Sequence, residues 1–315
     1  MKKYCKKMAV FTIIFVIVCI AVDCISMKEP WRRIIACMTD SEEFISINVG
    51  ADEIKPYIER AQKKDHTTKL ILGDSVCKQM FSGLQNDNDD ICMLGSNAAI
   101  SMTGQYILAK QYIENHKEVT DVYLIVLPGS LEVTFDTQWG YQYTVMPFVE
   151  TDTLKLLETD TIKKMEAVYG AFFMKPLVVE GIDKSAINRK IYLNLLNTYS
   201  SSYQQSSKYE IAEQYIKKIY ELCKEREIEL HLLACPVVES RRDEIEASKA
   251  DYMNTWLYTV FPEFLEEVVY YSNEETEDGA HFAGEFAVQE NYNEKLRIIL
   301  ADSSLLQELQ FKQSE

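Results

Sequence analysis

Short apolar runs with the composition of buried strands alternate along this chain with segments in which apolar residues recur at helical spacing. The strand-like runs cover residues 68–72, 90–94, 121–127, 228–234 and 267–271. Strands that alternate with helices pair in parallel, because each helix carries the chain back across a face of the sheet. The sequence therefore predicts an α/β fold in which a central parallel sheet lies between two layers of helices.

The segments between the strands define the domain organisation. Helical patterns are expected at residues 41–63, 98–115, 209–224 and 242–258. Residues 130–208 interrupt the alternation between the third and fourth strands with an aromatic stretch and further helical patterns. We expect this insertion to be a substrate cap on an α/β domain that spans residues 67–315. A helical lead-in at residues 28–66 precedes that domain.

The first 27 residues have the pattern of a membrane segment. Four lysines precede the uncharged run Met8–Val22, which spans roughly 22 Å as a helix, short of the ~30 Å hydrocarbon core. The run is apolar on all sides and no clear small-residue cleavage site follows it, which favours an uncleaved signal anchor over a cleaved signal peptide. Because the lysines would stay in the cytoplasm, we expect a single-pass protein of the cell membrane with an extracytoplasmic α/β domain.

The net charge argues against a nucleic-acid partner, and the cysteine spacing argues against a metal site or a disulfide framework. The chain has a net charge of −16, and residues 34–315 carry 26 basic and 47 acidic side chains. Binding of nucleic acid needs a basic face, so nucleic acid is excluded. The eight cysteines show neither the spacing of a metal site nor that of a disulfide framework. We expect most of them to be small buried hydrophobic residues, and we expect no cofactor and no metal.

Ser75 occupies a position at which α/β proteins place reactive groups. It follows Gly73 and Asp74 at the carboxyl end of the first strand and opens a helix. Ligands of open parallel sheets bind beyond such strand ends, where helix amides face charge that develops near the hydroxyl. Position alone leaves two interpretations open, because Ser75 is either a nucleophile or the N-cap of the helix.

Of the four histidines, His281 has the position that a general base requires. It follows the fifth strand, before an expected final helix, and so lies at the same edge of the sheet as Ser75. Asp278, three residues earlier, can bind one ring nitrogen and leave the other to face Ser75. The alternative is an exposed acidic loop that contains a histidine by chance. The other three histidines have structural interpretations, in a polar turn, at a helix C-terminus and within the fourth strand: His66, His116 and His231.

Three short blocks resemble those of the SGNH (GDSL-like) hydrolase superfamily. They are Gly73-Asp74-Ser75 after the first strand, Gly95 and Asn97 after the second, and Asp278-x-x-His281 near the C-terminus. The resemblance covers about residues 68–300 and implies a flavodoxin-like three-layer sandwich. It also implies that Ser75 is the nucleophile, His281 the base and Asp278 the acid that orients the base. The amides of Ser75 and Gly95 would then bind the oxyanion.

The third block departs from the family pattern. The third strand is followed by Leu127-Pro128-Gly129-Ser130, without the family's Gly-x-Asn-Asp. Asn97 can replace the missing side-chain donor, or it can be an N-cap. With this departure, the anchor and the aromatic insertion, the chain resembles the SGNH-like proteins that work beside membrane-bound O-acyltransferases. Among these are alginate acetylation proteins and the D-alanine transfer protein of teichoic acid synthesis. The resemblance implies a polysaccharide or cell-wall glycan as substrate and a membrane-bound O-acyltransferase as partner.

Two functions of different classes are compatible with the sequence. The first is a serine esterase or O-acyltransferase that acts on acyl esters, above all acetyl esters, of a cell-surface or exported polysaccharide. The second is a catalytically silent SGNH-like module that binds a polymer or scaffolds a membrane acyltransferase, as the altered third block would allow. Aromatic side chains of the insertion either stack on sugar rings or form the core of a small subdomain: Trp139, Tyr141 and Tyr143.

Overall fold

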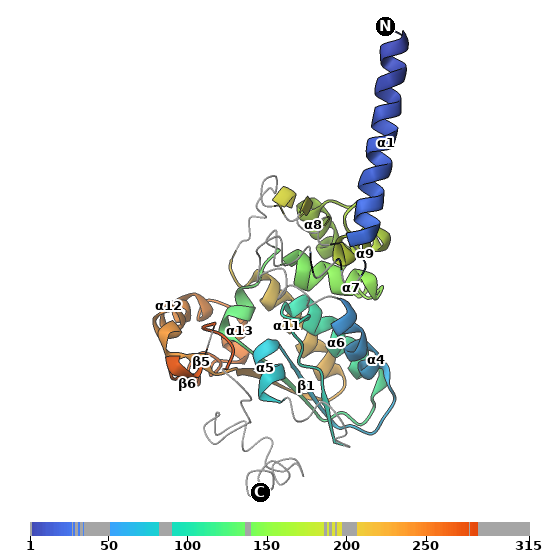
Figure 1. Ribbon diagram of the computed structural model, residues 1–315. Coiled ribbons are helices and arrows are strands. Elements are labelled where there is room, and N and C mark those ends of the chain that lie inside the picture. Colours follow the sequence, from blue (N-terminus) through green and yellow to red (C-terminus); the bar gives the residue numbers. More distant parts are fainter. Residues whose placement is uncertain are drawn as a thin grey trace, which may run out of the picture.

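Four parallel strands form the central sheet of the protein, which is described here from a computed structural model (Figure 1). The structure describes residues 2–26, 51–81, 90–135, 140–185, 207–276 and 278–282, with single residues within 28–34 and 188–196. The strands run in the order β2-β1-β3-β4. Their bounds are β1 Lys69–Gly73, β2 Ile91–Met93, β3 Asp121–Val126 and β4 Glu229–Ala234. The expected α/β fold with a parallel sheet is confirmed.

Alternate residues of the strands enter two separate hydrophobic clusters. Leu70 and Leu124 belong to the larger cluster, together with buried side chains of three helices, α4 (Ala51–Gln62), α6 (Met102–Asn115) and α11 (Glu210–Glu225). Ile71 and Ile125 point to the other face, where they pack with α5 (Ser75–Met80) and Phe282. Because successive side chains of a strand point to opposite faces, both faces of this sheet are covered.

The fifth predicted strand is shorter than expected and leaves the main sheet. Only Tyr270–Tyr271 forms a strand, β6, and it pairs in parallel with β5, Val237–Val238. The amides of Glu266 and Glu267 donate to the carbonyl of Glu263, so a turn holds the residues that were expected to begin the strand. Pro236 separates β5 from β4, because proline has no amide to extend the ladder.

Helix boundaries differ from the expected ones where local caps intervene. The helix expected from residue 98 begins at Met102, because the side chain of Ser101 caps it by accepting the amide of Gly104. The helix expected at 242–258 is two helices, α12 (Arg242–Tyr252) and α13 (Trp256–Val260), and Thr255 caps the second. Of the lead-in, α4 is described, while residues 41–50 and the helix expected after residue 282 lie outside the described residues.

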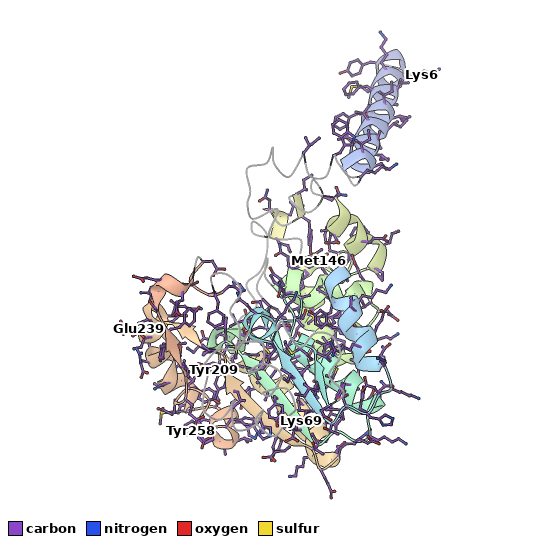
Figure 2. The ribbon with its side chains drawn as sticks, turned by 60° about the horizontal axis from the view of Figure 1, so that its bottom comes forward. Lys6, Lys69, Met146, Tyr209, Glu239 and Tyr258 are labelled. Carbon is purple, nitrogen blue, oxygen red and sulfur yellow. The ribbon has the colours of Figure 1, made fainter. Side chains whose placement is uncertain are left out.

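The insertion packs onto the main core. It contains α7 (Met146–Glu150), α8 (Thr159–Tyr169) and α9 (Pro176–Lys184), besides a π-helical turn at Tyr141–Val145. Met146, labelled in Figure 2, is 2% exposed and belongs to the same cluster as the side chains of α4 and α6. The described part of the insertion therefore shares the core of the α/β domain and has no separate one.

The N-terminal segment forms one helix. Lys2–Ser26 is α1, which extends away from the α/β domain in Figure 1. Apolar side chains from Met8 to Val22 are exposed along it. No helix within the described residues combines the length and the hydropathy that a membrane span requires.

Candidate active site

Asp74 holds the carboxyl ends of two neighbouring strands in place. Its Oδ1 accepts the amides of Val76 (3.1 Å) and Cys77 (3.3 Å), and so caps α5. Its Oδ2 accepts the amide of Leu127 and the hydroxyl of Ser130, both at 2.7 Å, which connects β1 to the segment after β3. The N-cap is therefore Asp74 and not Ser75, so the Ser75 hydroxyl is not used for capping.

Gly73 has to be glycine because of its surroundings. A Cβ at this position would lie 2.2 Å from the carbonyl oxygen of Ile125 and 2.3 Å from the Cβ of Cys77. Any side chain would therefore push β1 away from β3 or α5 away from the sheet. The Gly-Asp-Ser sequence thus combines a close approach at Gly73, a helix cap at Asp74 and a half-buried first helical residue at Ser75.

Ser75, His281 and Asp278 form one hydrogen-bonded chain. His281 Nε2 lies 2.7 Å from Ser75 Oγ, and His281 Nδ1 lies 2.6 Å from Asp278 Oδ2. These are the contacts that the sequence led us to expect, and Ser75 and His281 are 206 residues apart. With Nδ1 protonated toward the carboxylate, Nε2 has its lone pair toward the serine hydroxyl, which is the arrangement of a nucleophile, a base and an orienting acid.

The loop that carries His281 is built around the Asp278 carboxylate. Its Oδ1 accepts the amides of Ala280 (2.9 Å) and His281 (2.7 Å), and Gly279 between them has a φ of 76°. Partial burial raises the pKa of Asp278, but the hydrogen bonds from the backbone and ring of His281 and from Ala280 outweigh it and lower this pKa to about 2. Asp278 is therefore ionised at neutral pH.

Gln79 ties this loop to the helix that carries the serine. Its Nε2 donates to the carbonyl oxygen of Phe282 (2.7 Å), and its Oε1 accepts the amide of Phe282 (2.9 Å). Phe282 is 4% exposed and packs against Tyr271. Sequence analysis did not single out Gln79, although it lies four residues after Ser75 and so on the same side of α5.

The backbone amides of Ser75 and Gly95 are the main-chain candidates for oxyanion donors. Within the described part of the chain, the amides of Ser75 and Gly95 donate to no protein acceptor. A Cβ at Gly95 would lie 3.1 Å from the amide nitrogen of Lys78 and 3.2 Å from the sulfur of Cys77, so Gly95 lies directly against α5. The absence of a side chain thus lets the segment after β2 approach the helix that carries Ser75.

Asn97 is not the N-cap of the following helix. That role belongs to Ser101, and Ser96 Oγ accepts the amide of Ala98. The side chain of Asn97 is half-buried and makes no hydrogen bond to any residue that the structure describes. Asn97 therefore stays a candidate for the third oxyanion donor.

The residues after β3, where the sequence departs from the SGNH pattern, stabilise the carboxylate of Asp74. Ser130, in the short helix at Pro128–Glu132, donates its hydroxyl to the buried carboxylate of Asp74 and is itself 9% exposed. Burial raises the pKa of Asp74, while the hydrogen bonds from Ser130, Leu127 and the α5 amides lower it. The segment after β3 therefore supplies donors to Asp74.

The aromatic side chains that were candidates either for stacking on sugars or for a core are buried where they are described. Tyr141 is fully buried and donates its hydroxyl to the carbonyl of Phe173 (2.8 Å), and Tyr143 is 8% exposed. Their burial agrees with the core interpretation that the sequence left open. Trp139 lies outside the described residues.

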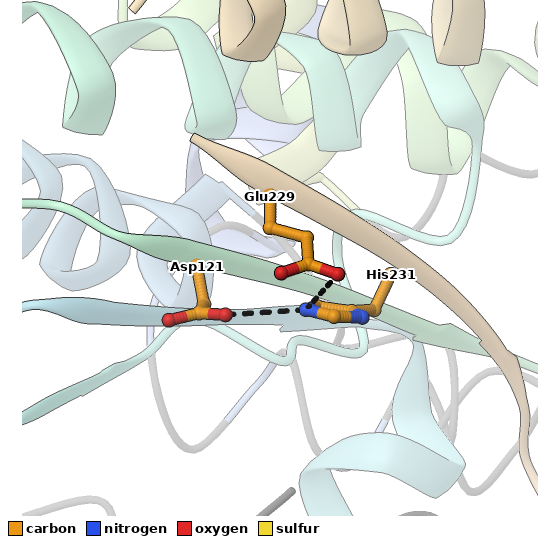
Figure 3. Close-up of side chains that lie close together, drawn as sticks. All are labelled: Asp121, Glu229 and His231. Atoms are coloured by element: carbon orange, nitrogen blue, oxygen red, sulfur yellow. Dashed lines mark hydrogen bonds and ion pairs between the residues drawn. The ribbon is translucent and has the colours of Figure 1, made fainter. Parts of the chain in front are cut away.

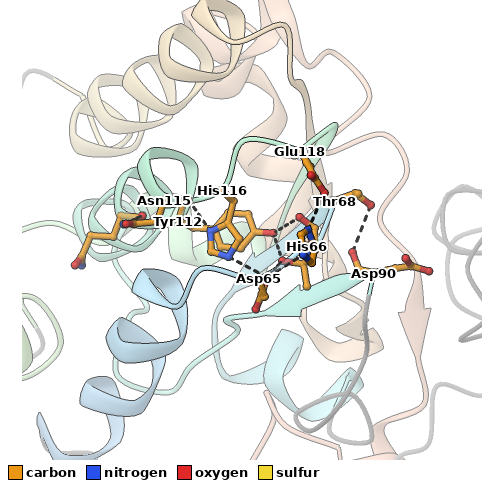
Figure 4. Close-up of polar contacts among 10 residues, drawn as sticks. Asp65, His66, Thr68, Asp90, Tyr112, Asn115, His116 and Glu118 are labelled. Atoms are coloured by element: carbon orange, nitrogen blue, oxygen red, sulfur yellow. Dashed lines mark hydrogen bonds and ion pairs between the residues drawn. The ribbon is translucent and has the colours of Figure 1, made fainter.

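The other histidines have structural contacts. His116 is buried at the end of α6, where Nδ1 contacts the carbonyl of Tyr112 (2.9 Å) and Nε2 contacts Asp65 (3.0 Å), as Figure 4 shows. His66 is exposed beside Glu118. His231 stacks on Tyr123 with ring centroids 4.6 Å apart. The described cysteines of the α/β domain are free and buried, as expected: Cys77, Cys92, Cys223 and Cys235.

Comparison with known proteins gives no relative. No protein-family profile, no curated protein and no solved structure matches this chain.

Proposed function

We propose that the protein is a serine-dependent esterase or O-acyltransferase of the SGNH type. The observation that carries the proposal is the chain of hydrogen bonds from Ser75 through His281 to Asp278, at 2.7 and 2.6 Å. Ser75 follows β1, whereas His281 and Asp278 belong to a loop near residue 280. No helix or strand contains both segments, so their contact is not a by-product of one secondary-structure element. His281 differs from a histidine that lies in an acidic loop by chance, because its ring lies between a serine hydroxyl and a carboxylate.

The proposed reaction has two half-reactions. Ser75 Oγ attacks the acyl carbonyl carbon while His281 Nε2 takes the hydroxyl proton, and the amides of Ser75 and Gly95 bind the oxyanion that forms. His281 then gives the proton to the leaving alkoxide, which produces an acyl ester on Ser75. In the second half-reaction His281 deprotonates water, for hydrolysis, or a sugar hydroxyl, for transfer. Asp278 stays ionised and holds Nδ1–H of the imidazolium.

The proposal includes an extracytoplasmic setting and a glycan substrate. The apolar side chains that α1 exposes from Met8 to Val22 support a membrane attachment, because an apolar surface of this kind needs an apolar environment. A cell-surface or exported polysaccharide is the proposed acyl acceptor or ester substrate, and a membrane-bound O-acyltransferase is the proposed partner. Alkaline extraction of membranes tests the attachment. The full-length protein should stay in the pellet, and a variant without residues 1–27 should not.

The decisive experiment compares the intact protein with Ser75→Ala. With p-nitrophenyl acetate, the wild type should gain the mass of one acetyl group and release p-nitrophenol, and Ser75→Ala should lose about 10³-fold or more in kcat. Ser240→Ala is the matched control, because Ser240 is exposed. Acetylated and unmodified glycans, supplied afterwards, distinguish hydrolysis from transfer.

Full turnover by Ser75→Ala would exclude covalent catalysis at this serine. If instead neither the wild type nor Ser75→Ala turned over p-nitrophenyl acetate, and the wild type bound glycan, the alternative of a catalytically silent polymer-binding module would hold.

A further inference from the structure

Two carboxylates and an imidazole converge at the edge of the sheet opposite the Ser75 site. Asp121 begins β3, Glu229 begins β4, and His231 follows two residues later on β4 (Figure 3). His231 Nε2 lies 3.2 Å from Asp121 Oδ1 and 3.9 Å from Glu229 Oε1. One potential ligand atom from each of the three residues lies within 4.8 Å of the other two. These atoms belong to strand starts, whereas Ser75 follows a strand end.

Among the residues that the structure describes, no lysine or arginine forms an ion pair with Asp121 or Glu229. Asp121 and Glu229 face each other directly in the register of β3 and β4, a position in which like charges destabilise a sheet. A protonated His231 neutralises only one of the two carboxylates. Lys69 lies opposite Asp121 on the other side, in β1, yet among the described residues it forms no ion pair with either carboxylate. A divalent cation with a neutral imidazole would balance both negative charges.

Two of the three distances between ligand atoms match those around one ion. With ligand bonds of about 2.1 Å, the separation between His231 and Asp121 corresponds to an angle of about 100° at the ion, and that between His231 and Glu229 to about 135°. The first is within the range of tetrahedral sites, and the second needs only a small rotation of Glu229, whose side chain is 74% exposed.

Neighbouring side chains already orient two of the three ligands. Thr120 donates its hydroxyl to Asp121 Oδ2 (2.6 Å), which leaves Oδ1 directed at the imidazole. The ring of His231 stacks on Tyr123 with an interplanar angle of 12°. His231 also lines a cavity of about 230 Å³ at the outer edge of β4, so an ion could reach it without unfolding of the sheet.

We propose that Asp121, Glu229 and His231 bind one divalent first-row transition metal ion, with Zn²⁺ as the best match to a mixed imidazole and carboxylate set. The site is structural, because it lies at the amino-terminal edge of the sheet and shares no residue with the proposed triad. It clamps β3 to β4. Sequence spacing could not indicate it, since Asp121 and His231 are 110 residues apart.

Metal titration of the chelator-treated, full-length protein tests the site. The titrations use a His281→Ala background, so that the imidazole beside Asp278 cannot add a second site. Zn²⁺ should bind with a stoichiometry of one, and Co²⁺ should give visible absorption bands that Zn²⁺ removes. At about 100 times the dissociation constant, Zn²⁺ should raise Tm by roughly 5 °C. Mg²⁺ and Ca²⁺ at equal concentration should not displace Co²⁺.

Matched variants locate the binding. His231→Gln should abolish the Co²⁺ bands, and Glu229→Gln should weaken Zn²⁺ binding at least about tenfold. His66→Gln is the control, because His66 also contacts a carboxylate, that of Glu118, but only one. Glu229 is exposed and has a single contact, so its variant folds even where His231→Gln does not. No saturable binding by the parent, equal binding by Glu229→Gln, or displacement of Co²⁺ by Ca²⁺ would each overturn the proposal.

Discussion

Gln79 should control the position of the proposed base without touching substrate. Its side chain makes both hydrogen bonds that join the backbone of Phe282 to α5, and Phe282 follows His281 directly. Replacing Gln79 with alanine removes both bonds but leaves the buried ring of Phe282 in its cluster beside Tyr271. The loop should therefore stay attached through its apolar contact and lose its fixed register relative to Ser75.

The size of the effect follows from the two bonds. Each intramolecular hydrogen bond contributes about 1 kcal/mol net, so the ordered state of the loop should lose about 2 kcal/mol relative to its open states. Since 1.36 kcal/mol corresponds to a factor of ten, kcat should fall by at most about 30-fold. KM for a small ester should change little, because Gln79 is not among the groups expected to contact it.

Steady-state hydrolysis of p-nitrophenyl acetate, together with thermal unfolding, separates positioning from general destabilisation. Gln214→Ala is the matched control, because Gln214 also donates two side-chain hydrogen bonds, to Glu158 (2.7 Å) and Thr161 (3.3 Å), on α11 away from the site. Both variants should lower Tm by similar amounts, and only Gln79→Ala should lower kcat. A kcat within twofold of the wild type in Gln79→Ala would refute the positioning argument.

Three further predictions concern the same site. Because the folded-state pKa of Asp278 is about 2, below the ordinary 3.8, its contribution to stability is present above about pH 4 and is lost as the pH falls toward 2; urea unfolding at pH 6, 4 and 3 should show this loss in the wild type and not in Asp278→Asn. Asp74→Asn turns an amide donor toward either the α5 amides or Leu127, which should cost about 1–3 kcal/mol in urea unfolding. Asn97→Ala should lower kcat about 10²-fold or more with unchanged Tm if Asn97 is the third oxyanion donor, and an unchanged kcat would mean that two amides suffice.

The sequence predicted the sheet and the site contacts where one local pattern determined the outcome. Apolar runs such as 121–127 became buried parallel strands, and the three-residue spacing of Asp278 and His281 sufficed to foresee their contact. The contact of His281 with Ser75 was expected from a fifth strand in the same sheet. In the structure β6 pairs with β5 in a separate two-stranded sheet, and the contact forms all the same.

The start of α6, the length of β6 and the role of the aromatic residues depended on competition between neighbouring groups. Hydrophobic periodicity in the sequence does not reveal the outcome of such competition. Asn97 and Ser101 are both favourable N-cap residues, and only packing selected Ser101. The strand expected at 267–271 lost its first residues to a turn closed on Glu263. Aromatic spacing in the insertion could not distinguish a sugar platform from a core, and the buried hydroxyl contact of Tyr141 belongs to a core.

The segment after β3, which lacks the Gly-x-Asn-Asp of the SGNH pattern, has a structural role at Asp74. In this chain, the buried carboxylate of Asp74 needs donors, and the segment after β3 supplies two of them, the Leu127 amide and the Ser130 hydroxyl. A residue at position 130 that serves Asp74 in this way cannot also face an oxyanion beside Ser75. Gly95 and Asn97, which follow the neighbouring strand β2, would then donate the hydrogen bonds to the oxyanion that the third block supplies in the SGNH pattern. The altered segment after β3 is thus compatible with an oxyanion site. The hydrogen-bond donors of such a site can come from different segments in different proteins.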